Sequence, residues 1–288
     1  MVSARSLSAL AVIAGVTWAT GSAVRRWWHE WGVDPLEATR LLPGDDLVPD
    51  AVAVDTRGID IAARPEDVWP WLVQMGFGRA GWYSYDVVDM RGRSADRILP
   101  EFQTLAEGDV MPAHPAGGFV VRGIDPGRSL VLYLDDEIAA AQAHAAEAAG
   151  KATAAGEAAA GAPAATGEAT AAAGETAEET PVNLRASGAF MASAMTRYAA
   201  SWTFVLEPTP TGTRLIERFR VRLEGGSQLA PIAQPALGFG VFLMARRQLL
   251  GIRERAEGRI ADRGPAGGTA GEPETYVVAP EPLVAAPG

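Results

Sequence analysis

The chain has 288 residues, a formal net charge of −10 and no cysteine. This acidic balance gives no general attraction for phosphate backbones, so nucleic acid is not an expected partner. The absence of cysteine excludes disulfides, thiolate metal ligands and cysteine nucleophiles. The three histidines, His29, His114 and His144, lie far apart in the sequence. They lack the paired spacing of a metal site, and we expect neither a metal nor a cofactor.

An uncharged apolar segment near the N-terminus begins at Leu7 and ends at Val24, a length of 18 residues. That length is at the lower edge of a membrane span. An Arg-Arg-Trp-Trp sequence follows directly, at residues 25–28. Indole rings beside arginine suit the headgroup region of a bilayer. We therefore predict a single-pass membrane anchor with its juxtamembrane segment over residues 1–32.

The same segment fits a second interpretation, that of a cleaved signal peptide. Arg5 precedes the apolar run, and Gly21-Ser22-Ala23 resembles a small-residue cleavage site. In the anchor interpretation two arginines follow the run, so the positive-inside rule favours a main domain in the cytoplasm. In the signal-peptide interpretation the main domain is secreted.

A strand and a helix are predicted next. Apolar residues alternate between Val52 and Ile61, as in a strand with one buried face. The alternation shifts phase near Gly58, so we expect a bulge there. Residues 64–75 are predicted to form a helix, because Pro65 suits its first turn and the acidic residues that follow suit its dipole. Residues 94–100 favour a short helix or a loop at the rim of a cavity.

Three short strands follow at hairpin spacing, over residues 109–112, 118–124 and 130–134. The sequence then becomes almost entirely Ala, Gly, Glu and Thr. Such a composition leaves little apolar surface to bury. We predict a disordered insert over residues 136–188 and a disordered tail over residues 264–288.

Order resumes with two strands and a long helix. The first strand alternates from Tyr198 to Leu206, and the second from Leu215 to Leu223. Arginines occupy the other face of the second strand, which is typical of an antiparallel sheet with one face in water. The helix is predicted over residues 234–262. Its apolar stripe consists of Phe242, Ala245, Leu249, Ile252, Ala256 and Ile260.

This order of elements predicts an α+β fold over residues 33–263. Strand, short helix, antiparallel strands and a long last helix are most simply packed as a curved antiparallel sheet wrapped around that helix. A stretch rich in aromatic residues, from Val68 to Asp86, lies where such a fold begins to enclose a small-molecule cavity.

At this point the chain resembles the SRPBCC superfamily, also called the START-like or helix-grip fold. The resemblance covers about residues 56–262 apart from the insert. It is carried by the Pro-Glu-Asp-Val-Trp helix start at residues 65–69, the Leu-Glu-Pro strand end at residues 206–208 and the long last helix. The fuller strings at residues 69–76, 81–86 and 94–102 look like a bacterial subgroup of uncharacterised members, related to polyketide cyclases and dehydrases. The resemblance implies a cavity between sheet and helix, and it does not imply a reaction.

Glu217 is the sharpest candidate for a functional residue. The phase of its strand places it on the apolar face, between Leu215 and Phe219. A buried carboxylate must be paired or must take up a proton. Glu217 is therefore either a general acid or base or ligand anchor, or the partner of an arginine of the last helix such as Arg246 or Arg253.

Aromatic and polar residues of the predicted cavity complete the candidate site. Asp86 is a second, weaker catalytic candidate, because it could orient a polar head group beside neighbouring tyrosines. The candidate ligand-binding residues are Trp71, Trp82, Tyr83, Tyr85, Asp86, Phe102, Trp202, Glu217, Phe219 and Phe242.

These features favour a membrane-anchored binder of a small hydrophobic ligand, such as a lipid or a polyketide-like molecule. One alternative is a cyclase or dehydrase in which Glu217 or Asp86 moves protons at a bound carbonyl compound. Another is a non-catalytic interaction module of the cell envelope, with the insert and the tail as tethers. A Glu217 variant separates the first two functions. Loss of turnover would indicate the enzyme, and loss of affinity alone would indicate the binder.

Overall fold

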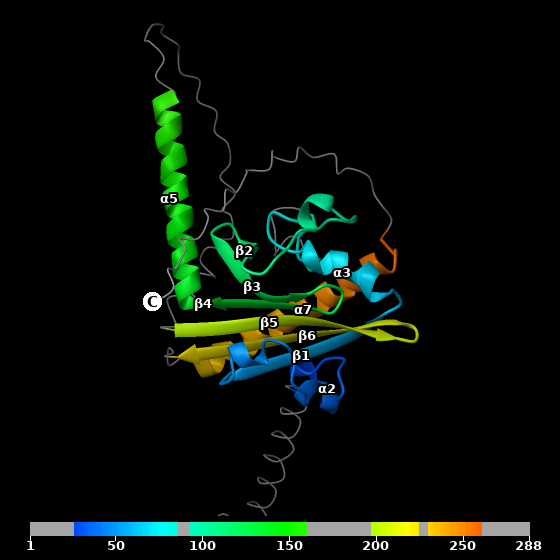
Figure 1. The fold of residues 1–288 in the computed structure, drawn as a ribbon. Helices are drawn as coiled ribbons and strands as arrows, with labels where there is room; N and C mark the ends of the chain where they lie inside the picture. Colours follow the sequence, from blue (N-terminus) through cyan, green and yellow to red (C-terminus); the bar gives the residue numbers. More distant parts are fainter. Residues whose placement is uncertain (1–25, 86–92, 161–196, 225–229, 261–288) are drawn as a thin grey trace, which may run out of the picture.

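The computed structural model describes residues 26–85, 93–160, 197–224 and 230–260. Its centre is one antiparallel sheet of six strands in the order β1-β6-β5-β4-β3-β2. With the helices around that sheet, the predicted α+β class is confirmed (Figure 1). The strands are β1 Ala53–Ile61, β2 Val110–His114, β3 Gly117–Asp125, β4 Ser129–Asp135, β5 Arg197–Thr209 and β6 Gly212–Glu224.

The named helices lie before, between and after the strands. They are α2 Pro35–Thr39, α3 Pro65–Val73, α5 Asp136–Ala160 and α7 Ala230–Ala256, with single 3-10 turns η1 Asp45–Leu47 and η2 Pro100–Phe102. Helix α7 runs behind the strands in Figure 1, and α5 rises away from one end of the sheet. Residues 94–99, predicted as a short helix or a loop, form a loop before η2.

Strand β1 is continuous, and the expected bulge near Gly58 is wrong. Its pairing with β6 runs without a register shift from Ala53 opposite Val221 to Ile61 opposite Thr213. The shift in apolar phase has another cause. The strand keeps its period of two, but polar residues occupy inward positions in its first half and isoleucines occupy them in its second half.

The inner face of the sheet holds the main core, together with α3 and α7. Helix α7 ends at Ala256, so Ile260 of the predicted stripe lies beyond the helix. Other residues of the stripe pack here, with Leu249 and Ile252 fully buried. These two residues belong to one cluster with Ile59 of β1 and Leu215 of β6. The position of α7 on this face is thus fixed by its apolar stripe.

The outer face is not in water where β6 runs, in contrast to the prediction. Residues 34–50, which we call the strap, cover it. Arg218 of β6 is only 3% exposed, and it donates to Asp45 at 2.7 Å and to three backbone carbonyls of the strap. Apolar residues of both layers meet beneath the strap, and Val48 and Ile216 are fully buried there. The arginines that suggested a wet surface instead hold a second layer of chain.

The expected disorder of the insert is corrected for its first 25 residues, which form helix α5. Alanine is the best helix former, and this raises the helical content of a sequence that buries little. The helix is joined to the sheet through its first turns. Asp136 Oδ1 accepts from the Tyr198 backbone N–H at 3.2 Å, and Gln142 Oε1 accepts from that of Gly118 at 2.9 Å. Residues 161–188 and the tail lie outside the described residues.

The predicted anchor, from Leu7 to Val24, also lies outside the described residues. Within the part of the chain that the structure describes, no helix has the length and apolar character needed to cross a membrane.

Candidate functional site

Glu217 points to the inner face, as its strand phase predicted, and only 1% of the residue is exposed. It lies opposite Arg57 of β1 and opposite Phe204 of β5. Its strongest contact is a hydrogen bond from Trp202, whose Nε1 donates to Glu217 Oε1 at 2.8 Å. The sheet therefore places a carboxylate in an apolar layer with one neutral donor.

The charged partner of Glu217 is Arg57, and the expectation of Arg246 or Arg253 is wrong. The Arg57 Nη1 atom lies 4.0 Å from Glu217 Oε2. This is an ion pair without a hydrogen bond. Arg246 instead lies over the ring of Trp31, with its guanidinium carbon 5.1 Å from the ring centre. Cross-strand pairing places Arg57 directly opposite Glu217, because β1 and β6 are hydrogen-bonded neighbours.

A buried chain of polar groups continues from Arg57. Its Nη2 donates to Asp55 Oδ2 at 2.9 Å, and the other carboxylate oxygen of Asp55 contacts Nδ1 of His29. Arg57 is 1% exposed and Asp55 is 9% exposed. Successive contacts thus link four side chains from the N-terminal segment to β6 under α7: His29, Asp55, Arg57 and Glu217.

Burial raises the pKa of Glu217 above its ordinary range. The positive charge of Arg57 and the hydrogen bond from Trp202 oppose that rise, while the carboxylate of Asp55 adds to it. The carboxyl group therefore holds a proton more readily than an exposed glutamate does, which suits a group that donates or accepts a proton at a bound molecule.

Three buried polar atoms of this cluster have no hydrogen-bond partner among the described residues: Arg57 Nε, Arg57 Nη1 and Glu217 Oε2. Most buried polar groups in proteins are hydrogen-bonded, so each exception needs an explanation. The three atoms lie on two facing side chains. An additional molecule that both accepts and donates hydrogen bonds would complete them.

Aromatic rings lie beside the carboxylate. Trp202 is at their centre, stacked on Trp82 with ring centres 5.3 Å apart. Phe119 and Phe219 meet its edges at 5.5 and 6.2 Å. Trp202, Phe119 and Phe219 are each only partly buried. We call these four rings the aromatic patch, and its partly exposed surface adjoins the Glu217 carboxylate through the Trp202 indole.

The structure brings four of the predicted ligand-binding residues together: Trp82, Trp202, Glu217 and Phe219. Phe242 is 1% exposed and joins the same region from α7, with its ring 5.9 Å from the Arg57 guanidinium carbon. These five positions form one site, although they come from β5, β6, α7 and the loop after α3.

Other predicted residues lie elsewhere. Tyr83 and Trp71 belong to the core beside α3, where the Tyr83 hydroxyl donates to the Trp71 carbonyl at 3.1 Å and accepts from Gln74 at 2.9 Å. Tyr85 is 46% exposed, and Phe102 lies in η2 beneath the Arg79 guanidinium. Asp86 lies outside the described residues.

Sequence reasoning missed four residues of the site: His29, Asp55, Arg57 and Phe119. A signal for two of them was present in β1. The loss of apolar alternation near Gly58 marks the inward positions of Asp55 and Arg57, and a continuous strand with buried charges explains it as well as a bulge. His29 and Phe119 reach the site only through tertiary packing, so no local pattern indicates them.

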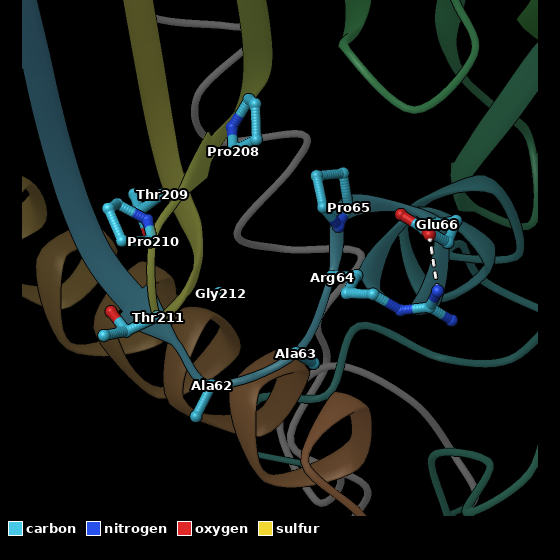
Figure 2. A pocket seen from close by; sticks show the side chains of 10 residues that line it. All are labelled: Ala62, Ala63, Arg64, Pro65, Glu66, Pro208, Thr209, Pro210, Thr211 and Gly212. Atoms are coloured by element: carbon cyan, nitrogen blue, oxygen red, sulfur yellow. Dashed lines mark ion pairs between the residues drawn. The ribbon is translucent and has the colours of Figure 1, made fainter.

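A shallow groove lies at another place on the molecule, with a volume of about 350 Å³. Figure 2 shows that it is formed by the β5–β6 turn and the connection from β1 to α3. Within the groove Arg64 pairs with Glu66 at 3.0 Å, and both side chains are largely exposed. None of the predicted site residues lines it. Among the described residues, no group of three His, Cys, Asp or Glu side chains is placed to hold a metal ion.

Comparisons with known proteins give little further guidance. No family model and no curated protein matches the chain. A solved structure from Mesorhizobium loti is similar over 72% of this chain and 97% of its own, at 17% identity and a TM-score of 0.31. An uncharacterized protein from Rhizobium leguminosarum covers 70% of this chain and 95% of its own, at 13% identity and a TM-score of 0.27. Likenesses at this level support no conclusion about family or function.

Proposed function

We propose that the chain is a membrane-anchored, SRPBCC-like helix-grip domain that binds a small hydrophobic ligand between its sheet and α7. The ligand would be a lipid or polyketide-like molecule, and the domain would lie on the cytoplasmic side of the membrane. The observation that carries the proposal is the incompletely paired Arg57–Glu217 cluster beside the partly exposed aromatic patch.

The chemistry of the cluster defines the head group. Arg57 Nε and Nη1 offer hydrogen-bond donors, and Glu217 Oε2 offers an acceptor when it is ionised. A hydroxyl group accepts from one and donates to the other. Arg57 already faces the carboxylates of Asp55 and Glu217, so a neutral head group adds no further charge that must be desolvated. The aromatic patch supplies apolar surface for the body of such a ligand.

Mass spectrometry of small molecules that co-purify with the full chain tests this proposal. We expect a hydrophobic compound with a hydroxyl or carbonyl group in the wild type and much less of it in Phe219→Ala. Phe102→Ala is the matched control, because Phe102 is also a partly buried phenylalanine but lies beneath Arg79 in η2. Equal amounts of compound in both variants, or none in any protein, would contradict a ligand at the aromatic patch.

A second function, that of a cyclase or dehydrase, is favoured by the raised pKa of the buried Glu217 carboxyl. Such a group can transfer a proton at a carbonyl compound. Once a ligand is identified, its conversion by wild type and Glu217→Gln decides between the two functions. Loss of turnover with retained affinity supports the enzyme, and binding without conversion by the wild type supports the binder.

Membrane anchoring through the segment from Leu7 to Val24 is tested by cell fractionation. The shortened chain must begin at Arg26, because Trp31 and His29 pack against Phe242 and Asp55 of the folded domain. We expect the full chain in the membrane pellet and the shortened chain in the supernatant. A mature protein that begins near Val24 and is soluble would favour the signal peptide.

A further inference from the structure

The first half of α7 exposes apolar side chains. Phe239 and Leu243 are each 39% exposed, and Val241 and Met244 are each 38% exposed. On the same helix Phe242 and Ala245 are buried against the rest of the protein. Several exposed large apolar side chains on one stretch of a helix that is otherwise packed against the protein indicate an interaction site.

This exposed face adjoins the N-terminal segment. The Trp27 ring meets Phe242 with ring centres 5.1 Å apart, and the Trp28 ring meets Phe239 at 5.5 Å. Trp27 is itself 55% exposed. We call Trp27 and the four exposed apolar residues of this stretch of α7 the α7 face.

The two chain segments that meet here both pass from uncharged to basic sequence. The run from Leu7 to Val24 carries no charge and is followed by Arg25 and Arg26. Residues 230–245 also carry no charge and are followed by Arg246 and Arg247. The aromatic contacts join residues 27–28, just after the N-terminal basic pair, to residues 239–242, just before the basic pair of α7. Arg246 of that second pair lies over the Trp31 ring, so the start of the described chain lies beside the uncharged half of α7.

We propose that the α7 face rests in the boundary between headgroups and acyl chains of the same bilayer that holds the N-terminal anchor. Tryptophan and arginine at an apolar boundary are typical of that region. Because Phe242, Leu249 and Ile252 bury the other side of α7 in the protein, the helix would lie along the membrane surface with its exposed side toward the lipid. The occupant of the face is lipid, because only Arg25 and Arg26 separate Trp27 from the uncharged run of membrane length that ends at Val24.

This placement connects the membrane to the candidate site. Phe242 contacts Trp27 on one side and lies 5.9 Å from the Arg57 guanidinium carbon on the other. One ring therefore separates the α7 face from the polar cluster, and a hydrophobic ligand would reach the site from the bilayer without crossing water. The inference rests on the membrane anchoring in the proposed function, and the test separates the two.

The absence of cysteine makes the full chain suited to single-site labelling. Leu243→Cys and, as a second position, Met244→Cys would carry an environment-sensitive fluorophore. Leu41→Cys is the matched control, since Leu41 is 89% exposed and belongs to the strap on the other face of the sheet. Each protein is reconstituted into phosphatidylcholine–phosphatidylglycerol vesicles with or without brominated acyl chains.

We expect the probes at residues 243 and 244 to shift to shorter emission wavelength with vesicles and to lose emission with brominated lipid, while the probe at residue 41 does neither. Co-flotation with vesicles but equal, unquenched emission from all three probes would overturn the α7 proposal and leave the anchor intact. A blue shift that needs no vesicles and is not quenched would assign the face to a second copy of the chain. A chain that stays in the lipid-free fraction overturns both.

Discussion

Arg57 and Arg218 are buried equally well on opposite faces of the same sheet, but their hydrogen bonding differs. Arg218 uses all three guanidinium nitrogens, which donate to Thr56, Asp45 and three strap carbonyls. Among the described residues Arg57 makes one hydrogen bond, to Asp55, and its Nε and Nη1 atoms have no hydrogen-bond partner.

The difference distinguishes a structural arginine from a candidate functional one. A fully satisfied buried cation recovers much of its desolvation cost and holds its partners in place. A partly satisfied cation lowers stability and is retained where an additional molecule or a reaction needs it. The outer face therefore joins the strap to the sheet, whereas in the proposed function the inner face presents groups for a ligand.

The largest effect is expected from Arg218→Met. The substitution removes five hydrogen bonds and leaves the buried Asp45 with only its longer ion pair to Arg220, at 3.7 Å, so it should cost about 3–5 kcal/mol of unfolding free energy. Urea unfolding of the full chain near neutral pH measures it. A cost below about 1 kcal/mol would show that the strap does not depend on Arg218 and would remove the basis of the comparison.

Arg57→Met tests the buried arginine on the inner face of the sheet. Only one charged hydrogen bond and a longer ion pair are lost, so we expect a smaller cost of about 1.5–3 kcal/mol in the same assay. The substituted chain should also lose its co-purified ligand, which Arg218→Met should retain if it is folded. A loss of stability equal to that of Arg218→Met would indicate that Arg57 is structural as well.

Glu217→Gln sharpens the comparison through pH. Burial raises the pKa of Glu217 above 4.5, so its contribution to wild-type stability is fully present below about pH 4.5 and is lost as pH rises through the folded-state pKa. Glutamine does not ionise, so the variant does not lose stability in this pH range through residue 217. Its stability relative to wild type should therefore improve between about pH 4 and pH 8, by about 1.4 kcal/mol per unit of pKa shift.

Urea midpoints at both pH values check this expectation. Because Arg57 keeps Asp55 at 2.9 Å, glutamine should not strand it. A loss of several kcal/mol near pH 8 would show that Arg57 requires the Glu217 charge, and the pair would then be a structural salt bridge.

The smallest effect is expected from Arg222→Gln on the outer side of β6. Its ion pairs with Asp50 and Glu224 are 3.3 Å long and largely exposed. Pairs of this kind contribute about 0–1 kcal/mol. This variant serves as the control for Arg218→Met, since it removes an arginine from the same strand face. A cost near that of Arg218→Met would mean that position on β6, rather than burial, sets the effect.

Local periodicity in the sequence determined much of the fold. The six strands, the position of α3, the stripe of α7 and the inward direction of Glu217 all follow from apolar residues at period two or 3.6, because each element must bury one face. These features depend on residues close together in the chain. Single-residue signals, such as Pro65 at the start of a helix, also act over a short range in the chain.

Tertiary structure decided the partners. Glu217 pairs with Arg57, 160 positions away, because β1 and β6 are neighbours, and no pattern within β6 indicates which arginine that is. The arginines of β6 gave the pattern of a wet surface, but the strap buries Arg218 by offering it carbonyls and Asp45. Long-range packing chooses among the acceptors and donors that the sequence supplies, and burial then sets their charge and chemistry.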